Sequence, residues 1–525
     1  MAGPIPAPSH RPLAPGDVDV LITAEEGFPA FERAVLATRD RIVAGFRIFD
    51  FSTKLRTPEA QAVGDDWFDL ILDAVNRGVA FTLVVSDFDP VVGTELHGET
   101  WRTLRSACAL VELARPDARI HVTTSLHPAT VGGLARLALW PRVRGLVSQK
   151  LRRFARRGDA SLARFLTRHP HLSEFIVRVG DHARPRAWPL PHLWPVTHHQ
   201  KAAVFDGREV YIGGLDLNER RWDTWRHDRD AEQTWHDVQL LVRDPETARA
   251  VETHLEEFCD VIDGETPPSD LDGRVLRTLS ARPLGANILA PRPVLHEIEE
   301  AILGGIAGAR QLIYIETQYL RSRRIARALA KAGQARPGLR LAVILPAAPE
   351  DVAFNGATRS DARFGEYLQA TAIRRLRRAF RGRLFVGCPA RPVTAQGGGR
   401  SVIHGAPLIY VHAKVFVADD TFAVVGSANL NGRSMRWDTE LAIPLTDREV
   451  VVGLRRRCLQ HLLGDAAETY PEVFEPDTTV PALQRLAVSN ARRRPETREG
   501  LVVPYLTRPG RRFGRVLRAV PEEMV

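Results

Sequence analysis

One segment of the 525-residue chain occurs twice in similar form. The first copy is THHQKAAVFDGREVYIGGLDLN at 197–218, and the second is VHAKVFVADDTFAVVGSANLN at 411–431. In both copies a histidine, a lysine, an aspartate and a glycine follow one another at the same spacing, and each residue of the second copy lies 213 positions after its counterpart. An offset this constant indicates an internal duplication, which has to be recognised before domains are counted.

The stretches before each copy predict the same α/β architecture. Apolar runs rich in β-branched and aromatic residues predict strands at 41–51 and 78–88, with a helix at 65–78 between them. The same strand–helix–strand order follows in the second half at 309–320, 323–334 and 339–350. We therefore expect an α/β protein made of two duplicated α-β-α sandwich halves, which are related by a pseudo-twofold axis and share one site.

The duplication also sets the domain boundaries that we expect. A Pro-rich flexible tail is expected at 1–19, a first half at 20–265 with a basic insert at about 141–187, a second half at 280–475, and a basic C-terminal tail at 476–525. Solvated surface charge is the simpler explanation of the insert and the tail. The alternative is adhesion to an anionic surface, where each Lys or Arg adds about 1 kcal/mol.

Composition narrows the partners and the compartment. The net charge of +9 favours an anionic partner, which is a phosphate, a nucleic acid or an acidic membrane surface. The four cysteines form no CxxC pair, so neither a zinc site nor a disulfide framework is indicated. The N-terminal segment lacks the features of a secretory signal, and no apolar run reaches the length of about 18 residues that a membrane span needs. We expect a cytoplasmic protein that is at most peripheral to a membrane.

Each copy predicts a hairpin that carries its histidine and its lysine on one face. Alternate residues of a strand share a face, so His199 lies beside Lys201 and His412 beside Lys414. One such pattern is weak evidence, whereas two copies at a fixed offset are strong evidence. Two histidines and two lysines that converge, with no nearby cysteine and no HExxH motif, predict an oxyanion site that uses no metal and no cofactor.

These residues resemble the signature of the phospholipase D superfamily, which is HxKxxxxD followed by GGxD/N or GSxN, twice. The segments GGLDLNERRWDTWRHD, TWHDVQLLV, IYIETQYL and residues 409–443 resemble plant- and animal-type phospholipases D, and the resemblance extends loosely over 20–470. It implies a hydrolase that cleaves glycerophospholipids to phosphatidic acid and the headgroup alcohol. Transfer of the phosphatidyl group to another alcohol is expected from the same intermediate.

The resemblance also implies roles for individual residues. It assigns the nucleophile that forms a phosphohistidine to His199 and the acid/base to His412, whereas the sequence alone is symmetric. Lys201 and Lys414 are expected to neutralise the phosphate oxygens in the transition state. Further phosphate contacts are expected from the residues that follow each hairpin strand, which are Gly214, Asp216, Asn218, Ser427, Asn429 and Asn431.

A carboxylate is expected to hold the tautomer of each histidine. Asp237 in WHDV and Glu440 in WDTE each follow their own copy, and we expect Glu440 to hold His412; surface ion pairs are the alternative for both. Asp206 and Asp419 lie at the hairpin turns. They are predicted to brace these turns through backbone contacts, which is a structural role.

Three functions fit these residues. The first is a phospholipase D, the second is a phosphatidyltransferase of the cardiolipin synthase kind, and the third is a nuclease. Cardiolipin synthases usually carry membrane spans, and the small nucleases of the superfamily are single-motif dimers, so we expect the first. The predicted partners are a phospholipid substrate and an anionic membrane surface, with no nucleic acid, and the chain is expected to be a monomer.

Overall fold

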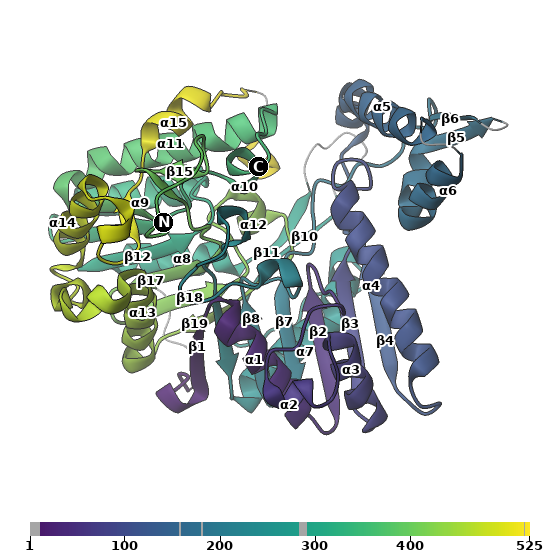
Figure 1. The fold of residues 1–525 in the computed structure, drawn as a ribbon, viewed down its shortest axis with the longest axis horizontal. Helices are drawn as coiled ribbons and strands as arrows, with labels where there is room; N and C mark the ends of the chain where they lie inside the picture. The colour runs from purple at the N-terminus through teal and green to yellow at the C-terminus, as the bar shows by residue number, and fades with distance from the viewer. Residues whose placement is uncertain (1–10, 157–158, 180–181, 283–290, 519) are drawn as a thin grey trace.

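Two halves of similar architecture lie side by side in the computed structural model, which describes residues 11–156, 159–179, 182–282, 291–518 and 520–525 (Figure 1). The first half is built on a seven-stranded sheet. Its strands lie in the order β1 (Val18–Ile22), β9 (Val238–Val242), β8 (Glu209–Gly213), β7 (Lys201–Phe205), β2 (Arg41–Phe46), β3 (Ala80–Ser86) and β4 (Ile120–Ser125). Strands β2, β3 and β4 are parallel to one another, and the other neighbours are antiparallel.

The second half repeats this sheet. Seven of its nine strands lie in the corresponding order, β10 (Leu276–Ala281), β19 (Glu440–Leu445), β18 (Phe422–Gly426), β17 (Lys414–Ala418), β12 (Leu312–Thr317), β13 (Arg340–Ile344) and β14 (Leu384–Pro389). The sheet is extended at its edges by β11 (Arg292–His296) and β20 (Val502–Pro504). The expected duplicated α/β fold is therefore confirmed.

Helices cover both faces of each sheet because alternate strand residues face opposite cores. On the outer face of the first sheet lie α1 (Thr23–Ala37), α2 (Pro58–Gln61), α3 (Trp67–Asn76) and α4 (Thr94–Leu113), and their counterparts in the second half are α8 (Glu297–Gly308), α9 (Arg323–Ala335) and α11 (Ser360–Phe380). The inner faces are covered by α7 (Pro245–Asp263) and α13 (Arg448–Leu463). The predicted helices at 65–78 and 323–334 correspond to α3 and α9.

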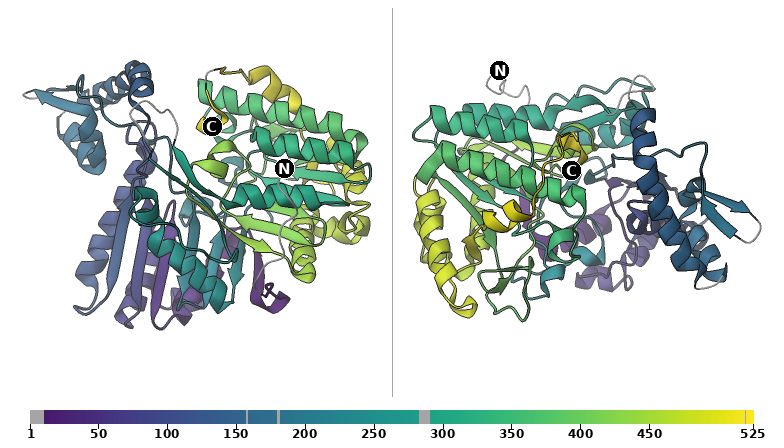
Figure 2. Two further views of the ribbon diagram at one scale, coloured as in Figure 1. Left: turned by 180° about the vertical axis from the view of Figure 1, so that it is seen from behind. Right: turned by 90° about the horizontal axis from the view of Figure 1, so that it is seen from above.

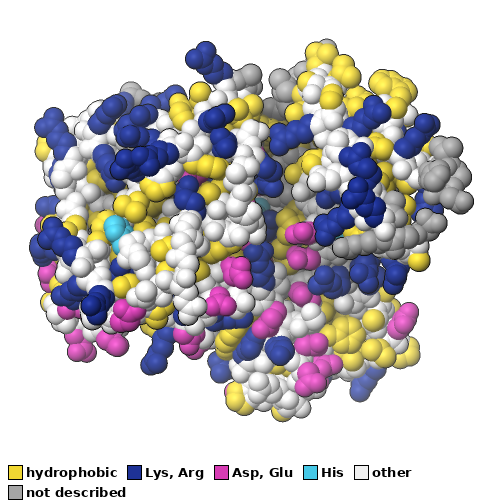
Figure 3. All heavy atoms as spheres, turned by 45° about the horizontal axis from the view of Figure 1, so that its top comes forward, with side chains coloured by type: hydrophobic (Ala, Val, Ile, Leu, Met, Phe, Trp, Pro, Cys, Tyr) yellow, Lys and Arg dark blue, Asp and Glu magenta, His cyan; other side chains and the backbone are white. Residues whose placement is uncertain are grey.

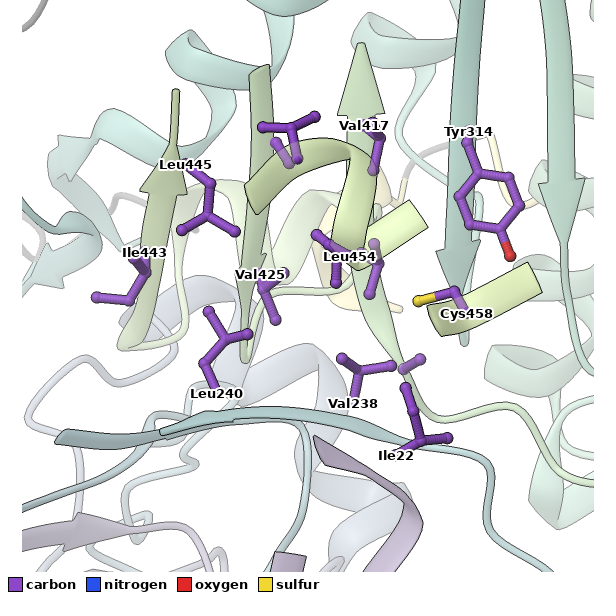
Figure 4. Packing of buried hydrophobic residues seen from close by; sticks show 14 of the residues in the cluster. Ile22, Val238, Leu240, Tyr314, Val417, Val425, Ile443, Leu445, Leu454 and Cys458 are labelled. Atoms are coloured by element: carbon purple, nitrogen blue, oxygen red, sulfur yellow. The ribbon is translucent and has the colours of Figure 1, made fainter. Parts of the chain in front are cut away.

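One apolar core joins the two halves. Ile22, Val238 and Leu240 of the first half lie opposite Val425 and Leu454 of the second half (Figure 4). All of these side chains are buried, and the cluster continues from the first sheet into the second without interruption. Burial of this apolar surface favours association of the halves and fixes how their edges meet.

The basic insert forms a small unit with a core of its own. It contains α5 (Gly133–Ala155), α6 (Asp159–Arg168), β5 (Ile176–Val179) and β6 (His182–Pro185), and it projects from the first half (Figures 1 and 2). Nη1 of Arg142 in α5 donates to Oγ of Ser360 in the second half at 3.3 Å, so the insert also contacts that half. Trp140, Val147, Leu151 and Phe175 are buried in its core. The insert therefore begins earlier than the expected boundary at 141.

The C-terminal segment is folded, which corrects the expectation of a basic tail at 476–525. Helix α14 (Thr479–Arg492) buries Val480 and Leu483, strand β20 pairs with β14, and α15 (Thr507–Phe513) packs on α11. Apolar residues between the arginines form the buried face of this segment. The many arginines made that face hard to recognise in the sequence. At the other end, β1 already begins at Val18, and residues 1–10 of the expected N-terminal tail lie outside the described residues.

Two short helices complete the regular structure near the site, α10 (Glu350–Ala353) and α12 (Gly432–Arg436), together with a two-stranded sheet of β15 (Val402–Ile403) and β16 (Ala406–Pro407). Among the helices formed by the described residues, none combines the length and the apolar character needed to cross a bilayer.

Candidate active site

The duplicated hairpins β7–β8 and β17–β18 bring their histidines and lysines to the edge where the halves meet. Lys201 opens β7 and pairs with Phe46, the last residue of β2, and Lys414 opens β17 and pairs with Thr317, the last residue of β12. Both lysines therefore lie at the carboxyl ends of parallel strands. This edge of an α/β sheet is the usual place for a binding site.

Backbone hydrogen bonds connect each histidine to the opposite half. The backbone N–H of His199 donates to the carbonyl of Thr439 at 2.8 Å, and the N–H of His412 donates to the carbonyl of His236 at 2.7 Å. Thr439 and His236 stand just before β19 and β9, the strands that neighbour the opposite hairpins. His199 thus lies beside Glu440, the first residue of β19 in the second half. His412 lies beside Asp237, which directly precedes β9 in the first half.

The carboxylates are exchanged between the halves. Nδ1 of His199 lies 3.0 Å from Oε2 of Glu440, and Nδ1 of His412 lies 2.6 Å from Oδ2 of Asp237. The expectation that Glu440 holds His412 was wrong, because the halves meet along the edges that carry these residues. Both pairs are almost fully buried, so they are not surface ion pairs.

Burial sets the protonation of both pairs. Burial, followed by the charge of a neighbouring lysine, lowers the pKa of His199 and of His412 well below the ordinary value. Burial also raises the pKa of Glu440 to about 8 and raises the pKa of Asp237. Within each pair the imidazole and the carboxyl shift toward each other, so they share one titratable proton.

The two lysines are buried beside the histidines. Nζ of Lys201 donates to the carbonyl of His199 at 2.7 Å, and Nζ of Lys414 lies 2.8 Å from Nδ1 of His412. Burial lowers the pKa of Lys201 and lowers that of Lys414 to about 7. A bound phosphate would raise both lysine pKa values again, because an adjacent anion favours the ammonium form.

Asp216 contacts the cations of the site and is not placed to contact a phosphate. Its carboxylate lies 3.5 Å from Nζ of Lys201, 3.3 Å from Arg47 and 3.2 Å from Arg221. Burial alone would raise the pKa of Asp216, but these three cations outweigh burial and hold it below its ordinary value. An ionised carboxylate accepts hydrogen bonds only and repels phosphate. The expected phosphate contact of Asp216 is therefore replaced by a role in orienting cations.

Gly214 and Ser427 serve the carboxylates of the two pairs. A Cβ at Gly214 would lie 2.0 Å from the carboxylate of Asp237, so only glycine leaves room for the group that holds His412. The hydroxyl of Ser427 donates to Glu440. Both residues were expected to contact phosphate directly. The structure instead places them against the carboxylates that hold the histidines.

The three asparagines have different surroundings. Oδ1 of Asn218 and Oδ1 of Asn429 are both buried without a hydrogen-bond partner, and Nδ2 of Asn429 donates to Gln318 at 3.2 Å. Oδ1 of Asn431 caps α12 through the N–H of Ser434, and its Nδ2 lies 3.5 Å from the carbonyl oxygen of Val525. Phosphate oxygens accept hydrogen bonds, so a contact needs an amide N–H donor. Nδ2 of Asn429 and Nδ2 of Asn431 already face protein oxygens, which leaves Asn218 as the asparagine that best fits the expected phosphate contact.

Asp206 and Asp419 brace strands from the hairpin turns. Asp206 accepts three consecutive backbone N–H groups where β2 begins, from Arg39, Asp40 and Arg41. Asp419 accepts the three corresponding groups where β12 begins. Both contacts are made to the neighbouring strand and not within the turn itself, which fits the predicted structural role.

Comparisons with known proteins agree with this geometry. A family model described as "Cardiolipin synthase, PLD-like domain" matches residues 302–461. Phospholipase D2 of Bos taurus is 34% identical over 113 residues, which are 18% of this chain and 12% of that protein. Phospholipase D1 of Saccharomyces cerevisiae is 25% identical over 379 residues, which are 54% of this chain and 22% of that protein. The chain is thus similar to proteins of the phospholipase D superfamily, and the match to the family model lies in its second half.

The chain spans less than a quarter of the length of these two curated relatives, 12% and 22% respectively. Among solved structures, a phosphatidylserine synthase of Haemophilus influenzae Rd KW20 covers 91% of this chain, and the match covers 95% of that chain, with a TM-score of 0.49 and 13% identity.

Two arginines of the candidate site were not predicted from the sequence. Arg47 follows β2 directly, and Arg221 lies in the loop after the first copy; both contact Asp216. The guanidinium of Arg221 also stacks on Trp235, 3.7 Å from the ring centre. The position of Arg47 after a parallel strand was a usable signal, whereas nothing in the loop distinguishes Arg221 from its arginine neighbours.

Three buried histidines lie close together near the site. The ligand nitrogens of His227, His236 and His461 lie within 4.8 Å of one another. The rings of His236 and His461 are nearly parallel, with an angle of 7° and centres 4.7 Å apart. A metal lies in the plane of each imidazole that binds it, so these two rings do not share one. His236 instead contacts Glu316, which is also buried, at 2.6 Å.

Proposed function

We propose that this protein is a phospholipase D-type phosphodiesterase that hydrolyses glycerophospholipids to phosphatidic acid and a free headgroup alcohol. The observation that carries the proposal is the pair of buried histidines, each held at Nδ1 by a carboxylate of the opposite half. Nδ1 is occupied in both, so Nε2 is the nitrogen left to react. Two such imidazoles beside two lysines fit a displacement at phosphorus in two steps.

In the first step, Nε2 of His199 attacks phosphorus and forms a P–N bond, while the bond between phosphorus and the headgroup oxygen breaks. His412 gives its proton to that leaving oxygen. Lys201 and Lys414 stabilise the charge that develops on the non-bridging oxygens. In the second step, His412 takes a proton from water, the resulting hydroxyl attacks phosphorus, and the P–N bond breaks to release phosphatidic acid.

The assignment of nucleophile and acid follows the family resemblance, because the geometry is nearly symmetric. An alcohol that replaces water in the second step would give a new phosphatidyl ester. This reaction is that of the alternative function, a phosphatidyltransferase. The match of residues 302–461 to a cardiolipin synthase-like model supports this alternative. The basic charge also permits a nuclease.

A substrate panel tests the proposal. The protein is incubated in chelator with phosphatidylcholine micelles, with phosphatidylglycerol and with a DNA duplex, and products are followed by mass spectrometry. Phosphatidic acid from phosphatidylcholine, and phosphatidylethanol when ethanol is added, are expected. Cardiolipin from phosphatidylglycerol without phosphatidic acid would favour the transferase, and cleavage of DNA alone would overturn the lipid assignment. His199→Ala and His412→Ala are each expected to abolish turnover.

The proposed partner is a bilayer surface, which the enzyme has to reach because its substrate is a membrane lipid. The basic side chains of the insert supply attraction to anionic headgroups, and this attraction weakens as salt screens it over a Debye length of about 8 Å. We propose that the enzyme works as a monomer, because both duplicated motifs and both carboxylates come from one chain.

A further inference from the structure

Helix α5 of the insert is apolar on two opposite faces. Its inner face packs into the core of the insert through Trp140, Val143 and Val147. Its first turns expose Leu134, Leu137, Ala138 and Pro141, which are spaced three, four and seven residues from the first and so share one face. Leu134 and Leu137 are 65% and 58% exposed. The apolar residues of the inner face are therefore accounted for by packing within the chain. Those of the outer face have no packing partner among the described residues.

Trp188 is a further exposed apolar side chain of the insert. It is 77% exposed, the largest exposed fraction among the large hydrophobic side chains of the described residues. Two contacts tie its loop to the start of α5: Arg136 approaches Nδ1 of His192 at 3.0 Å, and the N–H of Val131 donates to the carbonyl of Leu193 at 2.9 Å. We call Leu134, Leu137, Ala138, Pro141 and Trp188 together the apolar end of the insert.

Positive charge surrounds the apolar end. Residues 133–188 contain thirteen Lys and Arg and three acidic residues, so this segment accounts for the basic excess of a chain whose net charge is +9. Hydrophobic and basic side chains gather together over the insert (Figure 3, upper right). A surface of exposed Leu and Trp bordered by Arg and Lys matches a bilayer, with its apolar interior and its anionic headgroups.

The apolar end lies close to the site along the chain. Leu193, which is bonded to the start of α5, precedes the catalytic candidate His199 by six residues. A segment of this length spans at most about 20 Å. The connection between the start of α5 and His199 is therefore short, and it links the apolar end to the edge where the histidines lie.

We propose that the apolar end of the insert enters the outer acyl region of a phospholipid bilayer and holds the active site at the membrane surface. The proposal deepens the proposed function, on which it rests for the choice of a phospholipid bilayer as the partner. It differs from adhesion by charge alone, because burial of Leu and Trp in lipid is not screened by salt. Trp188 is the side chain best suited to the headgroup boundary.

The test measures binding to vesicles separately from catalysis. The inactive variant His199→Ala is mixed with phosphatidylcholine vesicles, with and without phosphatidylserine, at 0.1 M and at about 1 M salt. After sedimentation at high salt, part of the protein is expected to remain bound to both kinds of vesicle. Tryptophan emission is expected to shift to shorter wavelength on binding, and Trp188→Phe is expected to remove that shift.

Leu134→Ser with Leu137→Ser in the same background is expected to lower vesicle binding by about tenfold or more. Leu113→Ser is the matched control, because Leu113 is 64% exposed at the end of α4, outside the insert, and its loss is expected to leave binding unchanged. With active enzyme, the double variant is expected to lose activity on vesicles and to keep activity on a soluble short-chain substrate.

Two results would overturn the proposal. Binding that is lost entirely at high salt, or that is equal in the double variant and the Leu113→Ser control, would reduce the insert to an electrostatic contact. A change of oligomeric state in the double variant, measured by analytical ultracentrifugation with vesicle binding unchanged, would assign the apolar end to a second copy of the chain. Failure of the lipid-hydrolysis assay with vesicle binding intact would reject the proposed function and leave this inference standing.

Discussion

The exchanged carboxylates give each histidine a separable task at the scale of single residues. If His412 protonates the leaving oxygen, its partner Asp237 matters most when that oxygen is a poor leaving group. Asp237→Asn is expected to slow cleavage of phosphatidylcholine by about 10²–10⁴-fold, the usual contribution of a positioned acid. It is expected to slow a p-nitrophenyl phosphodiester far less, because nitrophenolate leaves without a proton.

Glu440→Gln is the comparison for this prediction. Its partner His199 makes the P–N bond with either substrate, so the loss is expected to be similar for both. Rates on the two substrates are measured side by side for the parent and both variants. Equal losses for Asp237→Asn on the two leaving groups would assign the acid to another residue.

The raised pKa of Glu440 predicts the acidic limb of the pH–rate profile. His199 attacks once its pair with Glu440 has lost the shared proton, and burial raises the pKa of Glu440 to about 8. In Glu440→Gln, His199 titrates without the carboxyl, and burial with Lys201 holds the pKa of His199 well below its ordinary value. The acidic limb of kcat/KM is therefore expected to move to lower pH, at a reduced plateau.

The profile is measured on a soluble phosphodiester, so that binding to lipid surfaces does not contribute. Asp237→Asn is the control, because its partner is the other histidine, and its acidic limb is expected to stay in place. An acidic limb that is unchanged in Glu440→Gln would show that the pair of His199 and Glu440 does not govern nucleophilic attack.

At the scale of elements, the two turn aspartates are predicted to stabilise the sheets without entering the chemistry. Three backbone N–H donors outweigh partial burial and hold the pKa of Asp206 below its ordinary value. A depressed carboxyl pKa contributes stability above the unfolded value and loses it as pH falls through the folded value. Asp206→Asn is expected to lower the free energy of unfolding by about 1–2 kcal/mol at pH 7 and by less below about pH 4.

Urea unfolding at the two pH values checks this difference. Asp117→Asn is the matched control, because Asp117 is an exposed turn residue. The kcat of folded Asp206→Asn is expected to equal that of the parent. A large loss of kcat with stability unchanged would place Asp206 in the reaction and contradict the structural role.

Local patterns predicted the elements well where periodicity and burial agree. Strands β2, β3, β12 and β13 carry continuous apolar runs, and helices α3 and α9 carry amphipathic spacing. The C-terminal segment was misinterpreted because β20 is only three residues long and α14 buries its apolar face against the second sheet. The folding of β20 and α14 depends on tertiary contacts, which an arginine-rich composition does not indicate.

At the scale of the whole molecule, the duplication predicted that four basic side chains converge, but it did not predict which carboxylate serves which histidine. The sequence places Asp237 after the first copy and Glu440 after the second, so proximity along the chain favours the wrong pairs. The correct pairs depend on how the two sheet edges meet. The buried core shared by Leu240, Val425 and Leu454 determines that meeting, and no local pattern encodes it.

The exchanged pairs predict that neither half is active alone and that both together are. Residues 1–266 and 267–525 separate at the exposed Thr266–Pro267 linker, where few contacts are lost. Either half expressed alone lacks the carboxylate for its own histidine and exposes the apolar face that joins the halves. Co-expression is expected to restore phosphodiesterase activity, because burial of that face drives reassociation.

A second half carrying Glu440→Gln is expected to impose the shifted acidic limb on His199 of the first half. Activity in either half alone, measured on the soluble phosphodiester, would mean that each motif finds its carboxylate within its own half.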